Sequence, residues 1–353
     1  MTIRRFDPNF SLPVDYIDER IRRNPVIMMY VEDRAPQLYH LATKGPFNLQ
    51  ATIRMLQRRP ANRVDHWVDD RYIRAFQTAE GLRLIVVSNA GTVDVPDIHL
   101  EILGGDIRIE TAQTLIDSIR WMLGLDADPT PSEWLAEVEP RLTSVLRALG
   151  GFRPPAFPSL FETSARVIPF QQLSLDAGTT ISGRLIDRFG SVLSIAGKDW
   201  VAFPAPEAIA SASIDSMRET GLSRAKSTAI QSLAYRAIAG ELSAEFHQHR
   251  PSSDSLKELQ KLPGIGPWTA GVILLRGLRR VDVFPTGDVG AARNLPLLLG
   301  DEDEWSPAQA CAFAERFGDQ RGYLYFLGLG SQLLTRGLIA GARPIGNPAE
   351  ITT

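Results

Sequence analysis

The chain has 353 residues, of which 44% are hydrophobic and 22% are charged, and its formal net charge is −3. These values are typical of a globular protein with room for more than one domain, and they exclude a surface covered in positive charge. No apolar run is long enough to span a membrane, the first residues lack the apolar core of a signal peptide, and the single cysteine, Cys311, excludes a disulfide framework. We therefore expect a cytoplasmic protein.

The first part of the chain, up to about residue 110, has mixed α/β character. β-Branched and apolar runs bounded by turn residues predict strands there, and the segment 48–56 is apolar with partial alternation. The leader over residues 1–45 fits no pattern. The predicted strands are 72–76 and 82–87, joined by a turn over 78–81, and 98–103, with 93–96 as a further candidate.

Beyond residue 105 the apolar residues recur at helical spacing, as Leu115, Ile119 and Met122 do. We predict helices over 111–123, 134–149, 160–170, 177–189, 206–213, 223–238, 307–317 and 323–338. The chain is thus of the α+β class. We expect an N-terminal α/β sheet domain over residues 1–108 and a helical region over residues 109–353.

The run Leu-Pro-Gly-Ile-Gly-Pro-Trp-Thr-Ala over 262–270 predicts two helices joined by a tight hairpin. Gly264 and Gly266 permit a positive φ and a close approach of backbone, and Pro267 suits the first turn of the second helix. Such a hairpin exposes backbone N–H groups at the positive end of a helix, which favours an anion such as a DNA phosphate. The alternative is an ordinary corner between two helices.

A single aspartate, Asp288, follows about twenty residues later in the run Val-Phe-Pro-Thr-Gly-Asp. An aspartate before the start of a helix is often only an N-cap. A carboxylate that the chain brings close to the hairpin is also a candidate for catalysis. The two roles are compatible.

The hairpin and Asp288 together resemble the helix-hairpin-helix superfamily of DNA glycosylases, and within it the 3-methyladenine DNA glycosylase II (AlkA-type) family. The resemblance is strongest over residues 158–337 and weaker back to about residue 47. Supporting segments are Phe-Gln-Gln-Leu-Ser at 170–174, Gly-Leu-Ser-Arg-Ala-Lys at 221–226 and Arg-Gly-Tyr at 321–323. The resemblance implies a small antiparallel sheet and two helical lobes with a cleft between them. It also implies an enzyme of base excision repair that removes a damaged, alkylated base from double-stranded DNA.

The resemblance assigns roles to residues of this chain. Asp288 would stabilise the positive charge that develops on deoxyribose, and Trp268 would stack on the extruded base. Leu173 would fill the gap left in the duplex, although a leucine or tryptophan on a helix can equally be an ordinary core residue. We expect Asp288 and Trp268 to face each other across a cleft that receives the base. The remaining implied contacts are Val272, Tyr323 and Leu329 to the base, and Gln172, Gly264, Ile265, Gly266, Thr269, Arg224 and Lys226 to DNA.

Three positions depart from the family pattern. Val272 stands where the best-known members place a tyrosine, and Leu329 and Gly330 stand where they place a Trp-Tyr pair. We expect a roomier and less aromatic pocket, so that etheno adducts, 8-oxoguanine and deaminated purines are open alternatives to 3-methyladenine. Trp268 occupies the position of the lysine that forms a Schiff base in bifunctional relatives, which predicts a glycosylase without lyase activity.

We expect neither a cofactor nor a metal centre. One cysteine cannot hold the iron–sulfur cluster of some relatives, and the spacing of His247 and His249 does not place both rings on one helical face. We expect a monomer that is associated with the nucleoid if the source is prokaryotic. A non-catalytic DNA-binding or lesion-sensing protein with the same hairpin remains an alternative.

Overall fold

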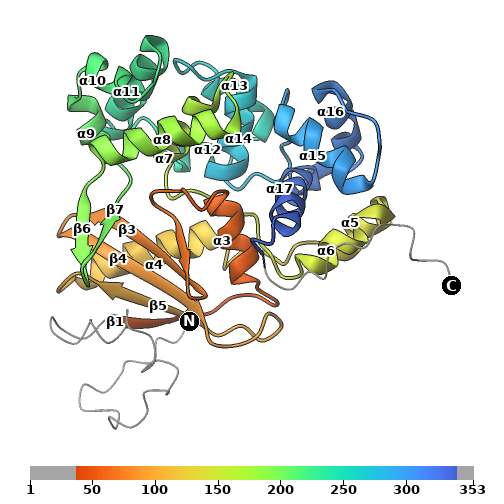
Figure 1. Ribbon diagram of the computed structural model, residues 1–353, viewed down its shortest axis with the longest axis horizontal. Coiled ribbons are helices and arrows are strands. Elements are labelled where there is room, and N and C mark those ends of the chain that lie inside the picture. Colours follow the sequence, from red (N-terminus) through yellow and green to blue (C-terminus); the bar gives the residue numbers. More distant parts are fainter. Residues whose placement is uncertain (1–36, 340–353) are drawn as a thin grey trace, which may run out of the picture.

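The computed structural model describes residues 37–339, so most of the leader predicted over 1–45 lies outside the described residues. The chain forms a sheet at one end and two groups of helices at the other (Figure 1). Within the described range, no helix has both the length and the apolar character that a membrane span requires.

The N-terminal sheet has five antiparallel strands in the order β1-β5-β4-β3-β2. The strands are β1 (Gln37–Leu41), β2 (His66–Val68), β3 (Arg71–Thr78), β4 (Gly81–Asn89) and β5 (Ile98–Leu103). Strands β3, β4 and β5 confirm the three predicted strands, and β3 turns into β4 where Thr78 pairs with Gly81. The further candidate at 93–96 is wrong, because this segment is a loop that contains Pro96, which has no N–H for a strand ladder.

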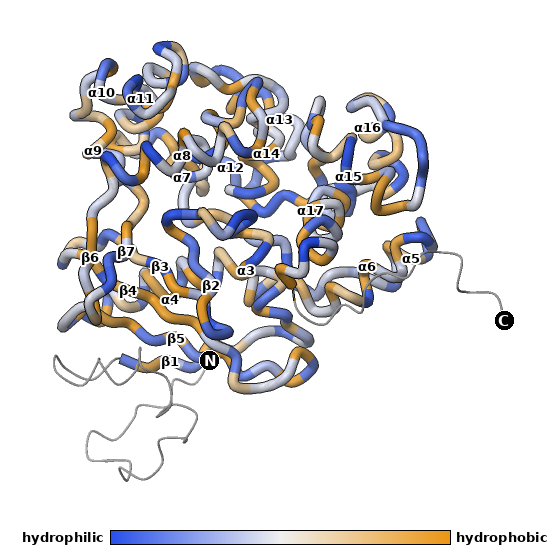
Figure 2. Tube along the Cα trace, viewed as in Figure 1, coloured by the Kyte–Doolittle hydropathy of each residue, from blue (hydrophilic) through white to orange (hydrophobic). Residues whose placement is uncertain are grey.

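Both faces of the sheet are covered. Helices α3 (Leu49–Gln57) and α4 (Ile109–Leu123) lie on one face and pack on alternate residues of the strands, such as Ile85, Val87 and Leu100. Figure 2 shows hydrophobic residues along these strands. Asn48 begins α3 by accepting a hydrogen bond from the Ala51 N–H at 2.9 Å. Because α4 packs on the sheet, the sheet layer extends past the expected boundary at residue 108.

The opposite face of the sheet is covered by a hairpin that the sequence patterns do not identify. Its strands are β6 (Val192–Ile195) and β7 (Lys198–Val201), and Trp200, which is 2% exposed, packs with Ile73 and Val86. The strands have four residues each, and the turn uses Ala196 at φ 56° before Gly197. An alanine in this left-handed conformation gives no turn signal in the sequence.

The helical region divides into two clusters, which meet the sheet through α3 and through α7. One cluster contains α5 (Ser132–Val138), α6 (Thr143–Ala148), α15 (Val289–Leu299), α16 (Pro307–Glu315) and α17 (Tyr323–Thr335). The other contains α7 (Leu160–Val167), α8 (Leu175–Phe189), α9 (Pro206–Ser211), α10 (Ile214–Arg218), α11 (Arg224–Ile238), α13 (Ser252–Leu259) and α14 (Pro267–Gly277), with the short α12 (Glu245–Gln248) alongside.

Most of the predicted helices are present, but several end earlier than expected, and two differ in a way that the sequence explains. The helix predicted over 134–149 breaks into α5, a 3-10 turn over Pro140–Leu142 and α6. Pro140 lacks the N–H that a continuous helix needs at that point. The helix predicted over 206–213 ends at Ser211, and Ser213 instead caps α10 through its hydroxyl.

A buried ion-pair network joins the sheet to the helices. Arg74 of β3 lies 2.8 Å from Asp65 and 2.6 Å from Glu162 of α7. Arg166, one turn further along α7, contacts the same two carboxylates. Burial opposes ionisation of Asp65, but the guanidiniums of Arg166 and Arg74 and the Tyr72 hydroxyl outweigh it and hold the pKa of Asp65 below its usual range.

Candidate active site

The predicted hairpin is present between α13 and α14. The backbone of Gly264 has φ 75°, and a Cβ on this residue would lie 2.6 Å from the Cβ of Ala229 on α11. Glycine is therefore required both by conformation and by close packing. Gly266 is the N-cap of α14, is exposed, and has no heavy atom within 4 Å of its would-be Cβ position. The positive end of α14 is thus open to an anion.

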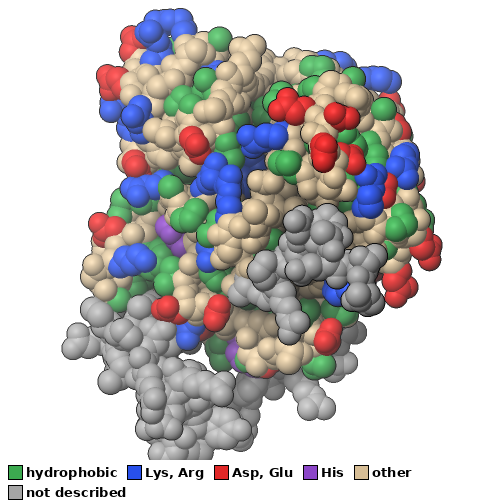
Figure 3. Space-filling model, turned by 45° about the vertical axis from the view of Figure 1, so that its right-hand side comes forward, with side chains coloured by type: hydrophobic (Ala, Val, Ile, Leu, Met, Phe, Trp, Pro, Cys, Tyr) green, Lys and Arg blue, Asp and Glu red, His purple; other side chains and the backbone are tan. Residues whose placement is uncertain are grey.

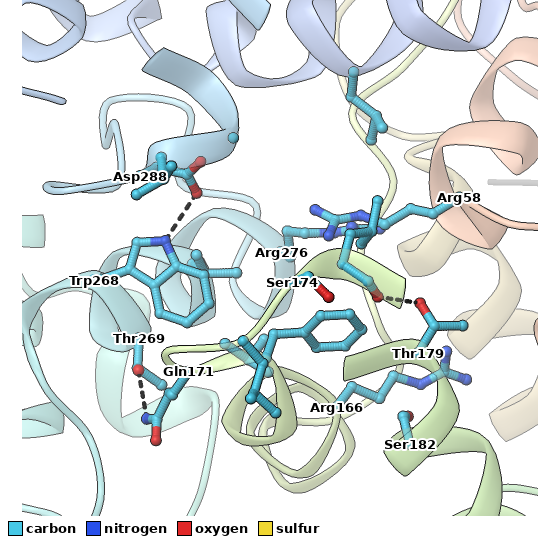
Figure 4. Close-up of a pocket in the computed structure, with 18 of the residues that line it drawn as sticks. Arg58, Arg166, Gln171, Ser174, Thr179, Ser182, Trp268, Thr269, Arg276 and Asp288 are labelled. Carbon is cyan, nitrogen blue, oxygen red and sulfur yellow. Dashed lines mark hydrogen bonds between the residues drawn. The ribbon is translucent and has the colours of Figure 1, made fainter. Parts of the chain in front are cut away.

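Asp288 is the N-cap of α15 and forms a direct hydrogen bond with Trp268. Its Oδ1 accepts a hydrogen bond from the Ala291 N–H at 2.7 Å, and its Oδ2 accepts one from the indole Nε1–H of Trp268 at 2.8 Å. Figure 4 shows the indole edge pointing at the carboxylate. The sequence led us to expect that these two side chains face each other across a cleft, and this expectation is wrong. Because a hydrogen bond joins them, a base cannot enter between them, and together they form one wall of a cavity.

A cavity of about 990 Å³ lies beside this wall and separates the two helical clusters. Asp288, 8% exposed, is the single carboxylate among the described residues that line it. The cationic residues that line it are Arg58, Arg59, Arg63, Arg166, Lys226, Arg276 and Arg293. Figure 3 shows Lys and Arg side chains gathered near the centre of one face. The cavity combines an excess of positive charge, which suits a phosphate backbone, with one negative group at its wall.

The loop between α7 and α8 forms another part of the cavity lining. Gln171 is fixed to the hairpin, since its Nε2 donates to the Gly264 carbonyl at 2.8 Å and to the Thr269 hydroxyl at 2.9 Å. Gln172 next to it has φ 56°, a strained conformation for a residue with a side chain. This turn leaves Leu173 43% exposed at the cavity mouth. An apolar side chain held outward in this way is not an ordinary core leucine.

Two family models match the chain and together cover most of it. The N-terminal domain of AlkA matches residues 38–159, and the HhH-GPD superfamily of base excision DNA repair proteins matches residues 165–316. Residues 165–316, which contain the hairpin, Trp268 and Asp288, belong to the HhH-GPD superfamily.

Curated relatives match the chain in sequence, and a solved structure shares its fold. A DNA-3-methyladenine glycosylase of Bacillus subtilis is 31% identical over 186 residues, which are 53% of this chain and 61% of that protein. DNA-3-methyladenine glycosylase 2 of Escherichia coli is 26% identical over 291 residues, which are 81% of this chain and 94% of that protein. The fold is similar to that of a 3-methyladenine DNA-glycosylase from Archaeoglobus fulgidus, with a TM-score of 0.69 at 23% identity over 84% of this chain and 99% of that one.

Several residues that the HhH-GPD resemblance singles out do line the cavity. Val272 is buried one helical turn beyond Trp268, and Leu329 of α17 is half-buried opposite. Thr269 lines the cavity but has little exposed surface, and its hydroxyl already accepts a hydrogen bond from the Gln171 side-chain amide. Lys226 is half-buried, and its ammonium donates to the carbonyls of Pro169 and Gln171. In this structure Lys226 therefore fixes the Leu173 loop and does not present a free cation.

Three of the residues predicted to contact the base or DNA do not line the cavity. Tyr323 is buried against Phe152, with 6.4 Å between ring centroids, and Tyr325 lines the cavity in its place. The Ile265 side chain is part of the core of the α7–α14 cluster, and its N–H donates to the Leu262 carbonyl. Arg224 begins α11 outside the cavity, where it pairs with Asp215 at 3.2 Å.

Arg58 and Arg276 are cavity residues that the sequence analysis missed. Arg58 follows the last residue of α3 at φ 59°, and its guanidinium lies 5.5 Å from the Tyr325 ring centre. Its Nε has no hydrogen-bond partner among the described residues. Burial lowers the pKa of Arg58 to about 10, against the attraction of Asp288. Arg58 therefore remains a cation at neutral pH.

Arg276 lies deeper than Arg58, at 2% exposure. Its Nη2 donates to the Met55 carbonyl at 3.2 Å, and its guanidinium lies 4.6 Å from the Phe157 ring centre. Burial, with repulsion from Arg58 and Arg166, lowers its pKa well below the usual range. Figure 4 shows Arg58 and Arg276 side by side, on the far side of the cavity from Trp268. Only the packing of α3 against α14 brings them together, so no local motif could have predicted them.

Proposed function

We propose that the protein is a monofunctional DNA glycosylase, which hydrolyses the N-glycosidic bond of a damaged base that has been flipped out of duplex DNA. The single carboxylate in a cationic cavity supports this proposal most directly. Cleavage of this bond develops positive charge on the sugar ring, so the reaction needs one negative group close to the ring. The DNA strand, in contrast, carries phosphates that cationic side chains attract.

Asp288 is the catalytic residue in this proposal. The Ala291 and Trp268 N–H donors hold its two oxygens in place, and such bonds are stronger to a carboxylate than to a neutral acid. A fixed carboxylate stabilises the developing oxocarbenium ion without reorganisation and can orient the attacking water. In the absence of substrate, Oδ1 caps α15 and Oδ2 is held by Trp268. The N-cap role therefore uses one oxygen of Asp288 and leaves the other on the side of Trp268 for catalysis.

DNA binding would use the open end of α14 and the Leu173 loop. Exposed Gly266 allows a phosphate to approach the first N–H groups of α14 without contact to a side chain. Leu173 would enter the stack that the extruded nucleotide leaves, at a site where flipping costs a few kcal/mol. The face of Trp268, whose edge is fixed by Asp288, would then stack on the base.

We also propose that the enzyme lacks lyase activity. A lyase of this kind needs a free amine next to the sugar, and the position expected for it holds Trp268. Lys226 is the lysine that lines the cavity within the described residues, and burial lowers its pKa, which makes an amine more reactive. Its hydrogen bonds to two carbonyls nevertheless hold it under the Leu173 loop.

A base-release assay with matched variants tests the proposal. Duplexes that carry 7-methylguanine, ethenoadenine, hypoxanthine or 8-oxoguanine would be incubated with wild-type protein, Asp288→Asn and a control variant of a distant carboxylate, Asp215→Asn. We expect the wild type and D215N to release at least one of these bases, and D288N to lose about a hundredfold or more in rate. D288N should still bind the duplex, because binding depends on cations and the hairpin.

Two other readouts separate the alternatives. Borohydride should trap no covalent protein–DNA complex with the wild type, whereas trapping that Lys226→Gln abolishes would overturn the monofunctional assignment. If wild-type protein binds lesion duplexes but releases no base from any of them, it is a lesion-binding protein and not an enzyme.

A further inference from the structure

A cluster of two histidines and one aspartate lies at the β1 edge of the sheet. Asp97 directly precedes β5 and His99 is the second residue of this strand, so the alternation of an extended chain places their side chains on the same side. His40 of β1 is the direct partner of His99 in the antiparallel pair. Neighbours of this kind have Cβ atoms only about 5 Å apart.

The ligand atoms of the three side chains converge. Nδ1 of His40 lies 3.5 Å from Oδ1 of Asp97, and Nε2 of His99 lies 3.1 Å from Oδ2. One ligand atom from each residue lies within 4.8 Å of the others, and no other such group of three occurs among residues 37–339. In a tetrahedral zinc site with bonds of about 2.0–2.2 Å, two ligand atoms are about 3.3–3.6 Å apart. The two histidine–carboxylate distances, each to a different oxygen of Asp97, are near this spacing, and the two histidine nitrogens lie within 4.8 Å of each other.

The Nε2 atom of His99 gives a second, independent indication of a ligand. It is buried from solvent and makes no hydrogen bond with a described residue, although the Asp97 carboxylate is 3.1 Å away. The carboxylate oxygen does not lie in line with the direction in which this ring nitrogen donates or coordinates. Ligands around a metal ion have this relationship, because each points at the ion and not at its neighbour.

The backbone holds Asp97 in position before any ligand binds. The Asp97 N–H donates to Oδ1 of Asn89 at 2.9 Å, and its carbonyl accepts the Ala90 N–H at 2.9 Å. These two bonds close the loop between β4 and β5. The His40 and His99 rings meet edge to face, with 4.4 Å between their centres. Little rearrangement is needed to bring all three ligands onto one ion.

We propose that His40, Asp97 and His99 bind a divalent transition-metal ion, with zinc the best match to two imidazoles and one carboxylate. Imidazole nitrogen together with carboxylate oxygen suits zinc better than magnesium or calcium, which prefer oxygen ligands throughout. Three protein ligands leave a fourth position for water. The ion would join edge strand β1 to β5, and it lies outside the cavity of the proposed glycosylase site.

Titration calorimetry of the full-length, untagged protein with zinc chloride tests this proposal. We expect one zinc ion per chain with micromolar or tighter affinity, and a higher melting temperature in the presence of zinc. His40→Ala and Asp97→Asn should each weaken binding by at least about tenfold. His40 is 67% exposed, so H40A should fold normally. His249→Ala, at an exposed histidine outside the cluster, is the matched control and should bind as the wild type does.

Cobalt substitution gives an independent readout of the coordination. Wild-type protein with Co²⁺ should show the visible absorption of a low-coordinate nitrogen and oxygen site, and H40A should lose it. The proposal is overturned if zinc does not bind, or if it binds equally to the wild type, H40A and D97N. Base release by H40A should equal that of the wild type, so failure of the metal site and failure of the glycosylase proposal are distinguishable.

Discussion

The indole Nε1–H of Trp268 donates to Oδ2 of Asp288 at 2.8 Å, so the aromatic wall and the carboxylate of the cavity form a single unit. Trp268 comes from the first turn of α14 and Asp288 from the start of α15. The bond joins the hairpin to the candidate catalytic residue. Movement of the hairpin on DNA would therefore also move the carboxylate.

Trp268→Phe separates the two contributions of this residue. Phenylalanine keeps an aromatic face for the base but removes the donor to Asp288. A hydrogen bond to a charged group contributes about 1.5–3 kcal/mol, so we expect kcat for base release to fall about tenfold to a hundredfold, with little change in DNA affinity. Single-turnover kinetics measures this directly. Trp134→Phe, at a tryptophan outside the cavity, is the control, and a wild-type kcat in W268F would show that the bond has no catalytic role.

Arg58 should influence which damaged bases are accepted. Its guanidinium cation lies in the cavity. It should repel 7-methylguanine, which carries a positive charge, but not hypoxanthine, which is neutral. Like-charge repulsion across a partly buried site is worth about 1–2 kcal/mol. We therefore expect Arg58→Met to raise the ratio of kcat/KM for 7-methylguanine over hypoxanthine by roughly tenfold, even if both absolute values fall.

Two control variants accompany this measurement. Arg58→Lys keeps the charge and should keep the ratio near that of the wild type. Arg63→Met removes a cavity arginine that is paired with Asp187 at 2.7 Å, and it should also leave the ratio unchanged. An unchanged ratio in R58M would mean that Arg58 does not lie near the bound base.

The Arg58 case shows where prediction from the sequence ends. The two glycines and the N-cap position of Asp288 were predicted because a short contiguous pattern specifies a hairpin and a helix start, and the roles of Asp288 and Trp268 were implied by the family resemblance that this pattern carries. Arg58 and Arg276 come from segments more than two hundred residues apart, and only tertiary packing brings them together. The three central strands were predicted from β-branched and apolar runs bounded by turn residues, whereas the β6–β7 hairpin was missed because its strands are short and its turn contains Ala196.

Tyr323 illustrates an error of register. The sequence predicted α17, and the family resemblance implied Tyr323 as a base contact, but the tyrosine of this helix that lines the cavity is Tyr325. Residues two positions apart on a helix point about 200° away from each other. Tyr323 and Tyr325 therefore face opposite sides of α17, and only the packing of the helix determines which one reaches the cavity.

Leu173 should matter for duplex substrates more than for substrates that are already unpaired. Its side chain is 43% exposed, so Leu173→Ala should cost little stability. Because a mismatched or single-stranded base is less costly to flip, we expect base release from a matched duplex to fall about tenfold and release from a single strand to change less. Leu297→Ala, at an exposed leucine of α15 outside the cavity lining, is the control. Equal losses on both substrates would exclude a wedge role.

The buried network around Asp65 predicts an acid-sensitive fold. Arg166 and Arg74 hold the folded-state pKa of Asp65 below its unfolded value, which makes the folded form bind fewer protons than the unfolded form in mild acid. The contribution of Asp65 to stability is therefore fully present above about pH 4, its unfolded pKa, and it is lost as the pH falls towards the folded-state value. Asp65→Asn leaves two buried arginines with one carboxylate, Glu162, and should lower the free energy of unfolding by about 3–5 kcal/mol at pH 7. Urea unfolding of the wild type and D65N at pH 7 and pH 3 measures both effects. The difference between the two proteins should shrink at pH 3, and a difference that stays constant with pH would contradict this account of the network.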